Sequence, residues 1–95
     1  MAVTVLLRIR GMSKEVYDEM NSAMRLDQNH MPDWMLAHYA AATPDGIQIF
    51  DIWESAETFA RHGQQDVMPA MASIVPGAAP NLEPEIHELY KEFTR

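Results

Sequence analysis

Two short apolar segments of the chain carry side chains that could move a proton. His38 and Tyr39 lie in WMLAHYAAA, and Asp51 lies a little further on in IQIFDIWE. A neutral imidazole accepts a proton near neutral pH, so His38 suits general-base work on a phenol or an enolisable ketone. Tyr39 and Asp51 could form an oriented donor–acceptor pair. The alternative is that these groups only satisfy hydrogen bonds in a core or at an interface, as buried polar groups normally do.

The two segments are predicted to be the strands of a hairpin, over residues 34–42 and 47–54. Between them TPDG, residues 43–46, fits a type I turn with proline at the second position and glycine at the fourth. If Thr43 faces Ile47 across the turn, Tyr39 faces Asp51 on one sheet face. His38 then lies on the opposite face. A shift of one residue would exchange these partners.

Aromatic and methionine side chains near the hairpin could line a pocket between sheet and helices. The candidate ligand-binding residues are Trp34, Phe50, Trp53, His62 and Met71. The two tryptophans could stack on a flat aromatic ligand, although tryptophan at a strand end also serves as a core anchor. His62 could face the pocket or be a partly exposed helix residue.

The remaining elements give the order β-α-β-β-α-β. Further strands are expected over residues 2–10 and 85–93, with an irregular connection over 76–84. Ser13 should cap a helix over 14–26, and Ser55 should cap a second one. Gly63 and Pro69 should kink the second helix or divide it in two. This order predicts an α+β fold, a ferredoxin-like antiparallel sheet with both helices on one face.

Composition limits the classes of partner. The chain has 95 residues, enough for a single domain spanning 1–95, and a formal net charge of −7. An acidic chain repels nucleic acid and anionic membrane surfaces. No apolar run suits a signal peptide or a membrane span, so a soluble cytoplasmic protein is expected.

Metal and nucleotide chemistry find little support in the sequence. There is no cysteine, and the four histidines are scattered without metal-ligand spacing. No glycine-rich phosphate-binding motif is present. We therefore expect neither a metal nor a cofactor.

The segment IFDIWESAETFARH…VMPAM resembles the dimeric α+β barrel superfamily, especially its antibiotic-biosynthesis-monooxygenase-like branch. The residues that carry the resemblance are Asp51, Trp53, Glu54, Ser55, Phe59, Met68 and Pro69. The resemblance implies a homodimer in which two sheets face each other. It also implies a small-molecule site, with activities that range from cofactor-independent oxidation of polycyclic aromatic compounds to cyclisation or isomerisation.

Haem-degrading members of the superfamily follow a pattern that this chain lacks. The resemblance implies an asparagine on the first strand, a helix tryptophan and a proximal histidine. Here the first strand has no asparagine, His62 replaces the tryptophan, and the histidine position falls near Met71 or Ala72. Haem degradation is therefore not expected.

Three functions remain in view. The first is a cofactor-independent monooxygenase or cyclase for an aromatic or polyketide-like substrate, with His38, Tyr39 and Asp51 as its catalytic residues. The second is a non-catalytic dimeric accessory or stress protein. The third is a haem or flavin binder, which would be coloured on purification.

Overall fold

The computed structural model describes residues 1–74 and 83–95, apart from the side chains of residues 64, 67, 71 and 74. The strands are β1 (Val3–Arg10), β2 (Met35–Thr43), β3 (Gly46–Trp53) and β4 (Glu85–Glu88). The helices are α1 (Lys14–Met24), α2 (Ala56–His62) and α3 (Met68–Ile74), and a π-helical segment, η1 (Gly63–Val67), joins α2 to α3.

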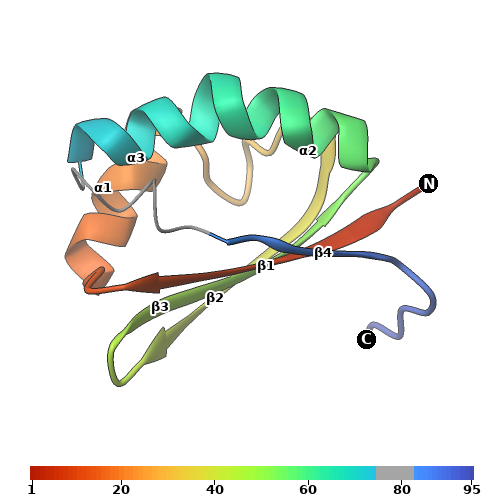
Figure 1. Ribbon diagram of the computed structural model, residues 1–95, viewed down its shortest axis with the longest axis horizontal. Helices are drawn as coiled ribbons and strands as arrows, with labels where there is room; N and C mark the ends of the chain where they lie inside the picture. Colours follow the sequence, from red (N-terminus) through yellow and green to blue (C-terminus); the bar gives the residue numbers. More distant parts are fainter. Residues whose placement is uncertain (75–82) are drawn as a thin grey trace.

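The strands form one antiparallel sheet in the order β2-β3-β1-β4. Both α1 and the continuous run from α2 to α3 lie on the same side of this sheet (Figure 1). The expected ferredoxin-like α+β arrangement is therefore confirmed. Within the described ranges, no helix has the length and apolar character needed to cross a bilayer.

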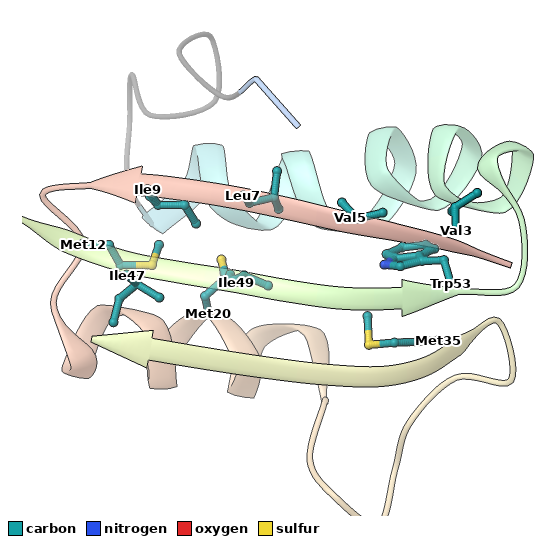
Figure 2. Packing of buried hydrophobic residues seen from close by; sticks show 10 residues of the cluster. All are labelled: Val3, Val5, Leu7, Ile9, Met12, Met20, Met35, Ile47, Ile49 and Trp53. Carbon is teal, nitrogen blue, oxygen red and sulfur yellow. The ribbon is translucent and has the colours of Figure 1, made fainter. Parts of the chain in front are cut away.

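The main core lies between the sheet and the helices. Strand residues alternate between faces, and the predicted apolar face of β1 is buried from Val3 to Ile9. Figure 2 shows these side chains beside those of β3 and of the loop and helix that cover them. The buried cluster consists of Val3, Val5, Leu7, Ile9, Met12, Met20, Met35, Ile47, Ile49 and Trp53.

The hairpin forms as predicted, but its register differs by one residue from the expectation. Thr43 pairs with Gly46 instead of Ile47. The reason is the turn itself, because the first and fourth residues of a tight β-turn are the pair that closes it. As a result Tyr39 does not face Asp51. His38 does, and Tyr39 faces Phe50 instead.

Gly46 is required by the close approach of β1 and β3. A Cβ atom at this position would lie 2.1 Å from the carbonyl oxygen of Ile9. That distance is far inside van der Waals contact, and the obstacle is backbone. The glycine that suits the turn thus also lets β3 pair with the end of β1.

A β-bulge interrupts the pairing near the start of β2. Met35 pairs with Trp53 and Ala37 pairs with Ile52, so Leu36 is an extra residue on β2. Leu36 is exposed, whereas Met35 is buried. The bulge therefore returns Met35 to the helix side of the sheet, three residues before His38.

The predicted helix signals are confirmed, with one shorter end. The Ser13 side chain accepts a hydrogen bond from the Val16 amide, and Ser55 forms a capping box with Thr58. The first helix stops at Met24 instead of Leu26, because Arg25 takes a left-handed conformation and closes the end.

The second helical region is divided, as expected, and the π-helical turn η1 separates its two α-helical pieces. A π-helical turn holds one more residue than an α-helical one and often marks a functional position.

The last strand is shorter than predicted. It covers Glu85–Glu88 instead of continuing to Phe93. Glu88 pairs with Val3, the first residue of β1, so the chain beyond Glu88 has no further strand residue to pair with. Most of the predicted irregular connection, residues 76–82, lies outside the described residues.

Candidate functional site

A chain of hydrogen bonds joins four side chains from three elements. His38 on β2 places its Nδ1 2.6 Å from Oδ1 of Asp51 on β3. The indole Nε1 of Trp53 donates to Oδ2 of the same carboxylate at 3.2 Å. On the other side of the imidazole, the Tyr17 hydroxyl of α1 hydrogen-bonds to Nε2 of His38. The order is Tyr17, His38, Asp51 and Trp53.

The contact with Asp51 fixes which tautomer a neutral His38 adopts. The Asp51 carboxylate can only accept hydrogen bonds, so Nδ1 of His38 carries the proton and donates it. Nε2 is then the acceptor and takes the hydrogen bond from Tyr17. The Asp51 side chain is only 5% exposed and that of His38 is 23% exposed. Water therefore competes little with these bonds, which favours a fixed imidazole orientation.

Tyr17 is held in its protonated form. Burial raises the pKa of the Tyr17 hydroxyl above its ordinary value; a hydrogen bond from Asn21 opposes this, and the negative charges of Asp51 and Asp18 add to it. A protonated phenol is a hydrogen-bond donor, which matches the acceptor state of Nε2 in His38.

A cavity of about 460 Å³ opens beside Tyr17 and His38, between α1, the following loop and β2. This volume is in the range of small-molecule sites, roughly 300–1,000 Å³. Apolar side chains and a few polar groups line it together. The lining residues are Tyr17, Asn21, Leu26, Asp27, Gln28, Met31, Met35, Ala37, His38 and Tyr39.

Asp27 shapes the loop that borders this cavity. Its carboxylate accepts hydrogen bonds from the Asn29 amide at 2.7 Å and from Nδ1 of His30 at 2.9 Å. These contacts, with that of His30 the largest, lower the pKa of Asp27. The rim of the cavity therefore carries a negative charge at neutral pH.

Three of the predicted ligand-binding residues belong to a packed aromatic cluster, which shares Trp53 with the hydrogen-bonded chain. Trp34 stacks on Trp53 with ring centroids 4.4 Å apart, and on His62 at 4.2 Å. Phe59 meets Trp53 edge to face at 5.0 Å. His62 is fixed further by Asp66, whose Oδ2 lies 2.9 Å from Nδ1. Trp34 therefore contacts both Trp53 and His62, and the two tryptophans pack as the core-anchor alternative describes.

The other predicted residues lie apart from the hydrogen-bonded chain. Phe50 pairs with Tyr39 in the sheet. Tyr39 lines the cavity, but its side chain is largely exposed. The side chain of Met71 lies outside the described residues. Of the three predicted catalytic residues, the structure brings His38 and Asp51 together and leaves Tyr39 aside.

Comparison with known proteins rests on solved structures, because no protein-family model and no curated protein sequence matches this chain. The Rv0793 protein from Mycobacterium tuberculosis matches with a TM-score of 0.65 at 13% identity, over 99% of this chain and 100% of its own. A candidate antibiotic biosynthesis monooxygenase from Chloroflexus aurantiacus matches with a TM-score of 0.64 at 20% identity, over 99% and 98%.

A third structure, a candidate antibiotic biosynthesis monooxygenase from Deinococcus radiodurans, has a TM-score of 0.56 at 14% identity, over 100% of this chain and 98% of its own. The chain has the fold of these proteins. The likeness supports the resemblance found in the sequence, and at these identities it establishes the fold alone.

Tyr17 was missed in the sequence because it belongs to an apolar helix stripe that indicates core packing. The stripe does pack against the core, and Tyr17 is part of it. A tyrosine on a helix face that covers a sheet must still find a partner for its hydroxyl. In this structure that partner is His38 on β2.

Among the residues that the structure describes, no group of three or more histidine and acidic side chains is placed to hold a metal ion. The hydrogen-bonded chain of Tyr17, His38, Asp51 and Trp53 has groups that can donate, accept and transfer protons.

Proposed function

We propose that the cavity beside His38 binds a small, largely apolar molecule of aromatic or polyketide-like type, and that His38 is the base that activates it. The observation that carries this proposal is the contact between His38 and Asp51 at the cavity wall. A carboxylate on Nδ1 orients the imidazole and stabilises the imidazolium that forms when Nε2 takes a proton.

The reaction is a deprotonation followed by oxidation or ring closure. With an anthrone, the base removes a proton from the methylene carbon between the aromatic rings. The resulting enolate gives its electrons to O₂. One oxygen atom becomes the new ring carbonyl, and the other leaves as water with the two methylene hydrogens. Asp51 remains ionised throughout and offsets the charge on His38.

The names of two matching structures support this class of chemistry. Both are described as candidate antibiotic biosynthesis monooxygenases. That description fits a site whose residues handle protons and whose oxidant is O₂.

A homodimer is part of the proposal. The face of the sheet away from the helices includes Tyr39, which is 55% exposed, and Phe50, which is 38% exposed. Large apolar side chains on an uncovered sheet face favour association, and a second copy offers an equal face.

The alternative is a non-catalytic accessory protein, and one observation favours it. Both ring nitrogens of His38 already have partners inside the chain, as a purely structural histidine would. A structural role does not require a ligand in the cavity, so ligand binding separates the two proposals.

The test is oxidation of a dihydroxyanthrone by the purified protein. The reaction is monitored by oxygen uptake and by the absorbance of the quinone that forms. We expect turnover above the spontaneous rate in the wild type, and a loss of about 100-fold or more in His38→Asn. Asparagine keeps a donor near the Nδ1 position and removes the basic nitrogen.

His87→Asn is the matched control, because His87 lies on β4 at the opposite edge of the sheet. Its rate should equal that of the wild type. Equal turnover in His38→Asn and His87→Asn would rule out His38 as the base, and no turnover in the wild type would favour the accessory protein.

A further inference from the structure

The hydrogen bonds of the site also indicate which side chain contacts the substrate. We infer that Tyr17 is the catalytic residue that contacts the acidic hydrogen of the substrate, and that His38 receives the proton through it. This inference rests on the proposed function and names a residue that the sequence did not single out.

Both ring nitrogens of His38 have hydrogen-bond partners within the chain. Nδ1 donates to Asp51, and Nε2 accepts from the Tyr17 hydroxyl. The imidazole therefore has no lone pair free to take a proton from a bound molecule. A substrate must either displace Tyr17 or deliver its proton through the Tyr17 oxygen.

Tyr17 borders both the cavity and His38. It lines the cavity together with His38, and the planes of the two rings are within 3° of parallel with centroids 6.0 Å apart. A phenol oxygen has two lone pairs besides its own proton, so it can accept from a substrate while donating to Nε2. The Tyr17 hydroxyl is thus a link between cavity and imidazole.

The proton reaches His38 in two coupled transfers. The substrate gives its proton to the Tyr17 oxygen while the Tyr17 proton passes to Nε2 of His38. Tyr17 ends as it began, the imidazole becomes imidazolium beside Asp51, and the substrate keeps the electron pair as an anion. Burial favours this order, because Tyr17 with its raised pKa is protonated at the start.

The surroundings of Tyr17 also narrow the class of substrate. Asp27 places an ionised carboxylate at the cavity rim, and the whole chain is strongly acidic. An anionic carboxylate ligand would meet repulsion there. The site therefore suits a neutral, weakly acidic phenol, enol or anthrone that becomes an anion only after it is bound.

The test compares Tyr17→Phe with Tyr90→Phe. Each change removes one hydroxyl from a tyrosine, but only Tyr17 lines the cavity and reaches His38, whereas Tyr90 is exposed and follows β4. With a dihydroxyanthrone as the probe, we expect kcat to fall by about 100-fold in Tyr17→Phe and to stay within twofold in Tyr90→Phe. The folded state is checked in both variants by the proton NMR signal of the His38 Nδ1–H bonded to Asp51.

A binding measurement separates the failure of this inference from the failure of the proposed function. The probe is the matching dihydroxyanthraquinone, which is neutral and cannot be oxidised further in this reaction. We expect Tyr17→Phe to bind it about tenfold more weakly than Tyr90→Phe, the effect of one lost hydrogen bond.

Each combination of results has a definite meaning. Turnover lost in His38→Asn but kept in Tyr17→Phe would overturn the inference and leave the proposed function standing. No turnover in the wild type, with binding that still depends on Tyr17, would support the contact and remove the reaction. Binding unaffected by Tyr17→Phe, or no binding at all, would overturn the inference.

Discussion

His38 and Asp51 face each other across β2 and β3, and Nδ1 of the histidine lies 2.6 Å from Oδ1 of the aspartate. The second oxygen of Asp51 is held by Trp53. The carboxylate is thus fixed from both sides, and its orientation decides which nitrogen of His38 carries the proton.

Replacing Asp51 by asparagine should reverse that tautomer. The indole of Trp53 needs an acceptor, so the amide oxygen should turn toward it and leave the NH₂ group facing His38. Nδ1 must then accept, and Nε2 carries the proton and can no longer take one. We expect turnover of a dihydroxyanthrone to fall by about 10³-fold or more.

The same change has a spectroscopic readout that needs no substrate. The downfield NMR signal of the His38 Nδ1–H should disappear in Asp51→Asn. Asp45→Asn, on the exposed hairpin turn, should keep both the signal and the activity. If the signal persists in Asp51→Asn, the assigned tautomer is wrong.

Stability at high pH should depend on Tyr17. The pKa of Tyr17 is raised by burial, whereas in the unfolded chain the hydroxyl ionises near its ordinary value of about 10. Above that pH the folded state binds more protons than the unfolded state, so the free energy of unfolding falls as pH rises. The contribution of this group is fully present below about pH 10.

Urea denaturation at pH 8 and at about pH 11 measures this effect. The wild type should lose more stability between these conditions than Tyr17→Phe does. Tyr90→Phe, which removes the hydroxyl of an exposed tyrosine, should behave like the wild type. Equal losses in the wild type and Tyr17→Phe would show that the hydroxyl ionises alike in both states.

Gly46→Ala should destabilise the sheet strongly. The added methyl group meets the Ile9 carbonyl oxygen at 2.1 Å, and only a backbone shift between β1 and β3 relieves the clash. We expect a loss of about 2–3 kcal/mol in the free energy of unfolding. Urea denaturation at one protein concentration measures the loss.

Gly63→Ala provides the matched control for this substitution. Gly63 has helical dihedral angles, and its added Cβ would meet only the Phe59 ring at 3.8 Å. This variant should be as stable as the wild type, or more stable by about 0.5–1 kcal/mol. A Gly46→Ala protein as stable as Gly63→Ala would contradict the close approach of the strands.

Phe50→Asp should separate the proposed dimer. The change places a charge on the sheet face that we propose a second copy covers, and an ionised side chain is costly to bury without a partner. Native mass spectrometry should give the mass of two chains for the wild type and of one chain for the variant. Ser73→Asp, at an exposed position of α3, should remain dimeric. A dimeric Phe50→Asp protein would exclude this face as the interface.

The fold was predictable from the sequence because its signals are local. The TPDG turn, the capping serines at positions 13 and 55, and the alternation of β1 act within a few residues of where they stand. The end of β4 was not predictable in this way. It depends on where β1 begins, at the opposite end of the sequence.

The candidate site was predictable only in part, because its contacts join distant positions. His38 and Asp51 were both identified, but a register one residue off assigned Asp51 to Tyr39. Tyr17 comes from another element altogether, and its helical spacing gives no sign of which strand residue it will meet. The catalytic roles of His38, Tyr39 and Asp51 stay predictions until turnover is measured.

The extra residue Leu36 lies between the aromatic cluster and the hydrogen-bonded chain in the sequence. Before it, Trp34 stacks against Trp53, and after it, His38 faces Asp51. Since Leu36 itself is exposed, many side chains should be acceptable there. The number of residues between Trp34 and His38 is the constraint, because adding or removing one would turn either the indole or the imidazole toward the wrong side of the sheet. A designed sequence can therefore replace the residue at position 36, but it must keep the number of residues between Trp34 and His38.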